Sequence, residues 1–359
     1  MNKNKLTAAL KRKALAAAVM VAVSGSALAD VTIYGIMDLS IGGNSGDNDA
    51  LVLSGGETNA AELPSIWGIK GSEDLGGGLT ASFALESDFN SSDGNDDRLG
   101  NNIFWNRQSN ITLSNDLGSI TAGRIYSPAI LTVLVTDPRQ LYEWQSGLIQ
   151  YATLASTTNT NTFGDVFLAN AIQFKFGADG LSAAVAYGFG EAAGDQEQNS
   201  NFHMGVSYSG GPLTIGGTYL KNKGNSVDSS QGEDEKSSIG LKYSMGDIAI
   251  AGHYMKGEAN DATGVQTTDN EGYAVGLIWK SGNNEFDVAY YGTKNEIANT
   301  TDNENDEIIL AYRNNLSKRT TLYAKLCAAD RGTNAPAGAC IGNAGENDTF
   351  YNFGLIHKF

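Results

Sequence analysis

The sequence predicts an all-β chain that folds as a 16-stranded antiparallel transmembrane β-barrel. Three observations lead to this prediction. Apolar and polar side chains alternate with a period of two, short and long connections alternate along the chain, and 44 Gly with only 5 Pro favour strands joined by many turns. Together they predict one domain whose strands run up and down.

The first 29 residues have the features of a secretory leader. Five basic residues precede an apolar run over residues 14–23, and the sequence ALA at 27–29 gives the small-x-small pattern of a cleavage site. The alternative, an N-terminal helix packed on a domain, does not explain that pattern. We therefore expect a signal peptide over residues 1–29 and a barrel over residues 30–359.

The exported chain is strongly acidic. Removing the five basic residues of the leader leaves 19 Lys and Arg (24 less 5) against 40 Asp and Glu, a net charge of −21. Such a chain repels nucleic acid, so we expect no nucleic-acid partner. No stretch after residue 29 reaches the roughly 18 apolar residues that a membrane-spanning helix needs, so we expect no helical span.

Alternating side chains mark the expected strands. Apolar and polar residues alternate in segments such as 31–41, 79–88, 202–209 and 308–313. One face of each strand is therefore apolar and the other is not. A soluble β-sandwich would show the same alternation, so the connections have to separate the two folds.

Connection lengths favour the barrel. Short turns are expected at residues 73–78, 115–118, 177–180, 210–212, 245–246, 282–284 and 315–318. Long polar connections are expected near residues 42–63, 91–103, 127–168, 191–200, 223–235, 259–270, 296–304 and 330–348. Short turns and long connections alternate along the whole series, so all short turns lie at one end of the barrel, as in bacterial outer-membrane barrels. Sixteen strands leave room for an aqueous channel, with the apolar face in lipid.

Aromatic residues near the strand ends suit the interfacial girdles of such a barrel. The residues concerned are Tyr187, Phe189, Tyr208, Tyr219, Tyr243, Tyr254, Trp279, Tyr290 and Tyr312. Ordinary cross-strand packing in a sandwich is the alternative, and the alternation of connections argues against it.

Four segments carry a resemblance to a known family. They read VTIYGIMDLSIG at residues 31–42, SIWGIKGSEDLGGGLTASFALES at 65–87, NRQSNITLSNDLGSITAGRIYSP at 106–128 and LSKRTTLYA at 316–324. These segments resemble the general trimeric bacterial outer-membrane porins, in the neisserial and burkholderial branch. The resemblance implies a homotrimer in the outer membrane of a Gram-negative bacterium. It also implies a water-filled channel for passive diffusion of small hydrophilic solutes and ions.

The third long connection, roughly Tyr126 to Ala169, is too long for a simple hairpin. In the resembled family this loop folds into the lumen and narrows the pore. Its carboxylates Asp137, Glu143 and Asp165 are therefore candidates for the acidic side of a constriction. An exposed loop with solvated carboxylates is the alternative.

The resemblance also implies a basic wall opposite that loop. Arg124, in the motif GRIY, matches one basic position, whereas Ile36, Ile66 and Ala169 stand where Lys or Arg is usual. Four lysines stand at positions that the alternation along their strands places on the inward face, and they could replace part of that wall. They are Lys70, Lys175, Lys242 and Lys325. A lysine at the wall can equally extend to a rim.

The carboxylates Asp38, Glu86 and Asp88 on the early strands are expected to face the lumen. Charged pore linings set ion preference. Because fewer basic residues stand on the wall than the resembled family has there, we expect mild cation selectivity. Acidic external segments such as 232–235 and 302–307 form either a solvated surface or a cation-bridged contact with lipopolysaccharide.

The two cysteines, Cys327 and Cys340, lie in the last hairpin of an exported chain, so we expect one disulfide. No metal site or cofactor is expected, because too few ligands lie close together. Three His and the absence of a GxSxG motif argue against an outer-membrane hydrolase.

Two other functions fit the same fold. A substrate-specific porin would need an organised track, for which the aromatic residues Trp105, Tyr142 and Trp144 are candidates, although they could instead anchor the loop. A surface adhesin or purely structural barrel would use the long loops for binding. Conductance in a lipid bilayer separates these functions, because a structural barrel would be silent.

Overall fold

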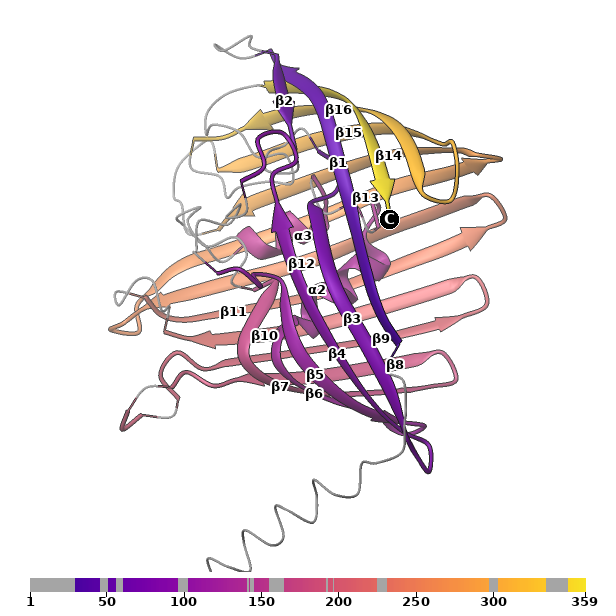
Figure 1. The fold of residues 1–359 in the computed structure, drawn as a ribbon. Coiled ribbons are helices and arrows are strands. Elements are labelled where there is room, and N and C mark those ends of the chain that lie inside the picture. Colours follow the sequence, from indigo (N-terminus) through magenta and orange to yellow (C-terminus); the bar gives the residue numbers. More distant parts are fainter. Residues whose placement is uncertain are drawn as a thin grey trace, which may run out of the picture.

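The strands close into a barrel that surrounds two short helices (Figure 1). The computed structural model describes residues 30–45, 51–55, 61–95, 103–140, 142, 145–154, 165–191, 193–195, 197–224, 231–296, 303–333 and 348–359. The strands are β1 (Asp30–Asn44), β2 (Val52–Ser54), β3 (Ser65–Gly76), β4 (Leu79–Phe89), β5 (Gln108–Asn115), β6 (Gly118–Tyr126), β7 (Phe167–Ala178), β8 (Leu181–Gly188), β9 (Asn201–Gly210), β10 (Leu213–Lys223), β11 (Gln231–Met245), β12 (Ile248–Asp261), β13 (Gln266–Ser281), β14 (Asn284–Asn295), β15 (Glu304–Asn315), β16 (Thr320–Arg331) and β17 (Asp348–Lys358). The helices are α2 (Pro128–Thr136) and α3 (Gly147–Thr153).

Pairing between the first and last strands closes the sheet. Ile36 on β1 is opposite Lys358 of β17 on one side and opposite Ile66 of β3 on the other. Each pair of neighbouring strands is antiparallel, and the three-residue β2 pairs with β1 as an additional short strand of the same sheet. The predicted 16-stranded antiparallel barrel is therefore confirmed, because closure leaves no unpaired strand edge in lipid.

Two connections are shorter than predicted: that at 223–235, where β11 already begins at Gln231, and that at 259–270. The region 259–270 reads as a long polar loop, yet β12 and β13 continue through most of it and only residues 262–265 join them. Lys256 lies 2.6 Å from Glu258 and 3.4 Å from Asp269, so charged side chains face each other across the two strands. Such cross-strand pairs stabilise a ribbon whose composition alone resembles a loop.

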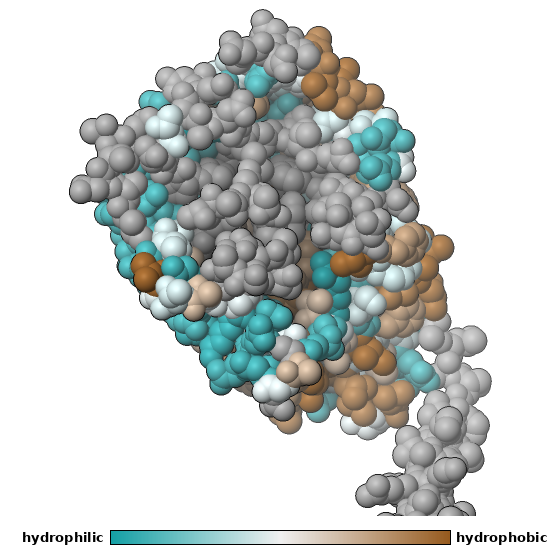
Figure 2. Space-filling model, turned by 90° about the vertical axis from the view of Figure 1, so that its left-hand side faces the viewer, coloured by the Kyte–Doolittle hydropathy of each residue, from teal (hydrophilic) through white to brown (hydrophobic). Residues whose placement is uncertain are grey.

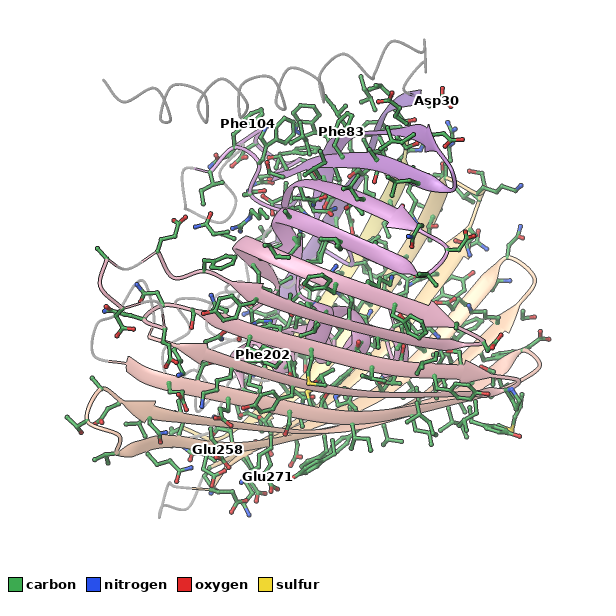
Figure 3. All side chains as sticks on the ribbon, turned by 90° about the horizontal axis from the view of Figure 1, so that it is seen from below. Asp30, Phe83, Phe104, Phe202, Glu258 and Glu271 are labelled. Atoms are coloured by element: carbon green, nitrogen blue, oxygen red, sulfur yellow. The ribbon has the colours of Figure 1, made fainter. Side chains whose placement is uncertain are left out.

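The outward face of the barrel is apolar. On β1 the residues Ile33, Met37 and Ile41 are exposed, while Asp38 and Ser40 between them are buried on the inner face. Hydrophilic residues gather at the end that carries the long connections, and hydrophobic residues gather on the flank beside it (Figure 2). Glu258 and Glu271 lie at that end, on the opposite side of the barrel from Phe83 (Figure 3). Neither described helix is long and apolar enough to cross a membrane.

The helices α2 and α3 belong to the connection between β6 and β7. Ser127 caps α2 by accepting from the Ile130 amide at 3.5 Å, and Pro128 suits the first helical turn because it needs no amide donor there. The helix lies against inward positions of β9 to β11. A Cβ atom on Gly205 would meet Thr132 at 2.2 Å and one on Gly240 would meet Thr136 at 2.1 Å, so only glycine permits this close approach.

Candidate functional site: the barrel lumen

Arg139 joins the connection between β6 and β7 to two distant parts of the chain. Its guanidinium lies 2.7 Å from Glu62, which precedes β3, and 3.2 Å from Asp287 on β14. It also donates to the Gln145 carbonyl at 2.8 Å. The three charged side chains are at most 1% exposed, so water screens these pairs only weakly.

Arg313 on β15 completes the same group. Its guanidinium lies 3.0 Å from Glu62, pairs with Asp287, and has its Cζ 3.4 Å from the ring centroid of Tyr142. We call Glu62, Arg139, Asp287 and Arg313 the buried ion cluster. Burial raises the pKa of Glu62, but the two arginines outweigh burial and lower that pKa to about 2. Glu62 is therefore ionised at neutral pH.

Asp38 on β1 anchors the segment that carries Glu62. One carboxylate oxygen accepts from the amides of Glu62 and Leu63 at 2.9 and 2.8 Å, and the other accepts from the Tyr323 hydroxyl at 2.7 Å. Lys325 on β16 donates to the Ala61 carbonyl at 2.7 Å. Asp38 and Lys325 thus point inward as their parity predicts, but this segment covers both of them.

Glu86 and Asp88 on β4 are paired with another buried arginine. Arg107 donates to Glu86 at 3.0 Å and lies 3.7 Å from Asp88. Tyr34 donates to the second Glu86 oxygen at 2.8 Å. Since neither side chain is more than 6% exposed, the two carboxylates offer little charge to a passing ion.

Arg124 lies beside this pair, at the base of the connection that holds the helices. Its Nε donates to the Asn106 carbonyl at 2.7 Å, and its Cζ lies 5.5 Å from the ring centroid of Phe167. The Tyr126 ring packs on Phe167 with 4.8 Å between centroids. Arg124 is therefore half-buried among residues that begin and end this connection.

Asp165 fastens the end of that connection to the barrel wall. It pairs with Lys236 of β11 and accepts from Asn222 of β10 at 2.6 Å. Burial raises the pKa of Asp165, but Lys236 outweighs burial and holds that pKa below its ordinary value. At the start of the connection, the Ser127 hydroxyl lies 2.7 Å from Nδ1 of His203, so both ends are attached to neighbouring strands.

Asp137 directly follows α2 and is fully buried. It accepts from the amides of Gly147 and Arg139 at 2.8 and 2.9 Å and from the Tyr291 hydroxyl at 2.9 Å. Burial raises the pKa of Asp137 to about 6, although these donors oppose the shift. Asp137 and Asp165 therefore hold the helical segment in place, and Glu143 lies outside the described residues.

The interior contains a cavity of about 440 Å³ beside this segment. Gln140 and Tyr142 line it together with Ile36, Lys280 and Lys358 from the strands. We call it the lumen cavity. Lys280 and Lys358 are exposed, in contrast to the buried carboxylates of the inner wall.

Further lysines occupy inward positions elsewhere on the wall. Lys70 and Lys175 are exposed and Lys242 is half-buried, each between two outward-facing residues of its strand. The Lys70 ammonium lies 4.9 Å from the ring centroid of Tyr34. The structure thus leaves basic groups accessible in the lumen.

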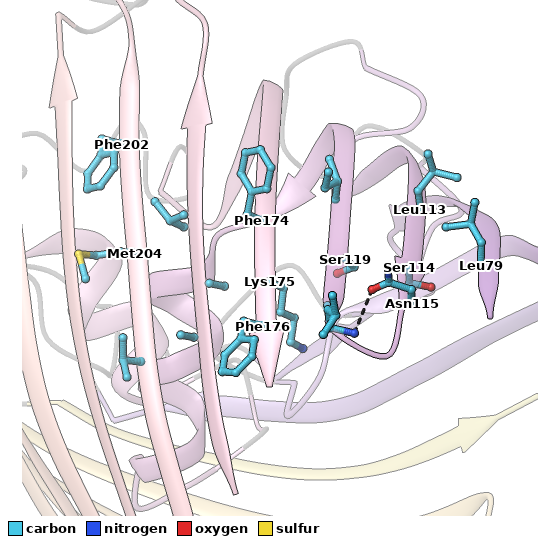
Figure 4. A pocket seen from close by; sticks show the side chains of 17 residues that line it. Leu79, Leu113, Ser114, Asn115, Ser119, Phe174, Lys175, Phe176, Phe202 and Met204 are labelled. Carbon is cyan, nitrogen blue, oxygen red and sulfur yellow. Dashed lines mark hydrogen bonds between the residues drawn. The ribbon is translucent and has the colours of Figure 1, made fainter. Parts of the chain in front are cut away.

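A larger hollow of about 730 Å³ lies on the outer wall rather than in the lumen (Figure 4). Apolar residues of β4 to β9 line it, among them Leu113, Phe174 and Phe202. These residues alternate with inward polar ones, so the hollow faces the lipid side and carries no solute path.

A model of the Gram-negative porin family matches residues 14–334. The chain belongs to the Gram-negative porin family. This porin is 27% identical to outer membrane porin protein 32 of Delftia acidovorans, over 97% of the chain and the full length of that protein. It is 30% identical to an outer membrane porin of Bordetella pertussis, but that match covers 58% of the chain and 59% of the relative.

The fold of this porin is similar to that of an anion-selective porin from Comamonas acidovorans. The two share 22% identity and a TM-score of 0.78, with 92% of this chain and the whole of that chain covered. Family membership places the barrel in the Gram-negative outer membrane. Its relatives are porins, which form channels rather than catalyse reactions.

Several predicted features of this porin lie away from the lumen, pack against the barrel wall inside it, or fall outside the described residues. Trp105 packs against Trp67 on the outer wall, with 5.2 Å between centroids, and Tyr142 stacks on Arg313. Trp144 and Cys340 lie outside the described residues, so a disulfide between Cys340 and the buried, inward-facing Cys327 stays a prediction. In the described part of the chain, no group of three or more His, Cys, Asp or Glu could hold a metal ion.

Glu62, Arg107, Arg139 and Arg313 were not singled out in the sequence. Each lies in a polar stretch or at a strand end where charged residues are ordinary. Parity marks Arg313 as inward-facing, but its partners lie 26 and 251 residues away in sequence. Only the closed barrel brings these groups together.

Proposed function

We propose that the protein is an outer-membrane diffusion channel for small hydrophilic solutes and ions. The observation that carries this proposal is a closed 16-stranded barrel with a polar interior and a cavity inside it. A barrel of this width leaves an aqueous path. Purified protein added to a planar lipid bilayer should produce stepwise conductance. A silent bilayer would instead favour an adhesin or a structural barrel.

The channel should prefer anions, although carboxylates at inward positions predict the opposite. Asp38, Glu86 and Asp88 are buried and hydrogen-bonded or ion-paired, so they contribute little to the field that an ion meets. Accessible inward groups include Lys70 and Lys175. The selectivity named for the Comamonas relative agrees with this inference.

Reversal potentials in a potassium chloride gradient measure this preference. We expect chloride to permeate faster than potassium, and the double variant Lys70→Gln/Lys175→Gln to reduce the ratio. Asp88→Asn serves as the contrasting change, because it removes a carboxylate that is already paired with Arg107. A potassium preference in the unaltered channel would contradict the inferred selectivity without contradicting the channel itself.

The segment between β6 and β7 should set the width of the channel. In support, α2 packs on inward glycines of β9 and β11, while Arg139 ties the residues after it to Glu62 and β14. Gln140 and Tyr142, which follow Arg139, line the lumen cavity. A segment held at both ends and in the middle cannot swing out to open the full barrel.

We further propose that the channel is a homotrimer with lipid on only one sector. At the short-turn end, outward aromatic residues lie on β7 to β15, namely Phe176, Tyr208, Tyr243, Trp279, Phe286 and Tyr312. The comparable outward positions on β1, β4, β5 and β6 hold Ile33, Leu79, Leu113 and Ile120. Since aromatic girdles mark the lipid interface, the aliphatic sector is the better candidate for contact between copies.

Lipopolysaccharide is the proposed partner of the outer rim on the other sector. Carboxylates there, such as Glu235, Glu258 and Glu271, are outward-facing at the ends of β11 to β13. Lys221 lies 2.7 Å from Glu235, so part of this charge is already compensated. Divalent cations could bridge the remaining carboxylates to lipid phosphates. Chelation should then release lipopolysaccharide from the purified protein.

A further inference from the structure

The lumen cavity has an apolar strip, which is unusual for a wall that faces water. Ile36 on β1 and Ile66 on β3 are direct neighbours across the two strands, and both line the cavity. Leu63 and Pro64, from the segment that Asp38 anchors, line it as well. Four apolar residues thus border the lumen cavity.

Packing keeps this strip in place. The Leu63 amide donates to Asp38 at 2.8 Å, and the neighbouring Glu62 is held by both arginines of the buried ion cluster. The strip therefore cannot withdraw from the cavity without breaking buried ion pairs. Its apolar surface remains in contact with whatever fills the cavity, and an apolar solute body would remove that surface from water.

Cationic groups border the same strip. Lys358 on β17 is directly opposite Ile36 in the sheet, is exposed, and has no carboxylate partner among the described residues. Lys280 also lines the cavity, 3.3 Å from Glu285. Arg107 lines the cavity too, but it is paired with Glu86 and Asp88, so Lys358 supplies the positive charge that no carboxylate among the described residues offsets. The charge of the described lining favours an anion.

We propose that the lumen cavity binds amphipathic organic anions, that is, small carboxylates with an aromatic or aliphatic body. The carboxylate would pair with Lys358 while the apolar body lies on Ile36 and Ile66. Gln140 offers an amide donor or acceptor from the facing segment. This inference rests on the proposed channel function and names the solute class that the channel would retain and select.

Benzoate is a suitable probe because it joins one carboxylate to one apolar ring. Single-channel current is recorded in about 0.1 M potassium chloride, where charges within about 10 Å still interact. Benzoate should block the current in a saturable manner. Acetate lacks the ring, and benzyl alcohol and benzylammonium lack the negative charge, so these three should block far less at equal concentration.

Variants test the apolar strip and the cationic group of the cavity separately. Ile36→Asn/Ile66→Asn should raise the half-blocking concentration of benzoate by about tenfold, because the ring loses its apolar contact. Lys358→Gln should raise it by about fivefold through loss of the ion pair. Lys318→Gln is the matched control, since this exposed lysine lies in the turn between β15 and β16 and is not among the residues that line the cavity, and it should leave the block unchanged.

Two results would overturn the proposal while leaving the channel function intact. Equal block by benzoate and acetate would show that the apolar strip is not used, and an unchanged benzoate block in the double asparagine variant would show the same. Chloride conductance of that variant verifies that it has folded. A protein that conducts without these differences retains the channel function and loses only this inference, whereas a silent bilayer removes both.

Discussion

Arg139 and Arg313 each reach carboxylates from two distant parts of the chain, and both guanidinium groups are inaccessible to water. A buried ion pair gives little net stability compared with apolar packing, but removing one partner leaves the other charged and buried. The main effect of these arginines is therefore to fix the positions of other groups. They hold Glu62 and the helix-bearing segment against the wall.

The first prediction concerns Arg313. Arg313→Ala leaves Asp287 buried with only Arg139, so we expect a loss of about 3–5 kcal/mol in the free energy of unfolding. Urea titration followed by the gel mobility of folded and unfolded protein measures this loss. Lys175→Ala is the control, because this lysine is exposed on the inner wall, and it should change the midpoint little. Equal midpoints for the two variants would contradict the prediction.

The second prediction concerns pH. The pKa of Asp137 is raised from 3.8 to about 6, so its contribution to holding the segment is complete below pH 3.8 and is lost as pH rises through 6. The pKa of Glu62 is lowered from 4.5 to about 2, so its contribution is complete above pH 4.5 and is lost as pH falls through 2. A segment that is held less firmly in the lumen makes the current through the open channel fluctuate more. The noise of that current should therefore increase from pH 4 to pH 7, and again below pH 3.

Asp137→Asn isolates the first of these two titrations. The amide does not ionise, so the rise in noise between pH 4 and pH 7 should disappear, while the change below pH 3 remains because Glu62 is intact. A variant with the same noise profile as the parent would show that another group controls the loosening.

Sequence parity predicted which residues face inward, but it could not predict which inward charges are accessible. Asp38 and Glu86 do point inward, yet Leu63 and Arg107 cover or neutralise them. Those partners lie 25 and 21 residues away in sequence. Accessibility depends on how connections fold back onto the wall, and that information is absent from the alternation of a single strand.

At the level of elements, inward glycines permit α2 to lie on the wall. The third prediction is that Gly205→Val displaces α2, because its Cβ would clash with Thr132, and destabilises the protein by about 1–3 kcal/mol. Gly217→Val is the matched control on β10, where the nearest atom to an added Cβ is the Ser238 carbonyl oxygen at 3.7 Å. Thermal unfolding and conductance should change in the first variant only.

Element boundaries show where sequence patterns were sufficient. Glycine-rich turns such as 210–212 and 282–284 are strong local signals, and the structure has turns there. The short α2 was not predicted, since nine residues with a mostly buried surface have no amphipathic period. The charged ribbon of β12 and β13 reads as a loop in the sequence, because polar composition outweighs alternation when both faces are polar.

At the level of the whole molecule, the outer wall has two sectors of different composition. The sector around β11 to β15 combines aromatic residues at the short-turn end with charged side chains at the other end, such as Tyr243 with Glu235 on β11. The exposed apolar residues of β1 are aliphatic, among them Ile33, Met37 and Leu39. A barrel that contacts lipid on all sides would need the same composition around its whole wall. In a trimer, one sector contacts other copies instead of lipid, so its composition can differ.

The fourth prediction tests this contact directly. Leu39 on β1 and Val288 on β14 face outward and are similarly exposed in the single chain, at 36% and 42%. A photo-reactive residue at position 39 should yield covalent dimers and trimers when membranes are irradiated, because that side chain meets a second copy. The same residue at position 288 should react with lipid and yield none. Oligomers from position 288 but not from position 39 would place the contact on the aromatic sector, and aromatic girdles would then no longer distinguish lipid from protein on this barrel.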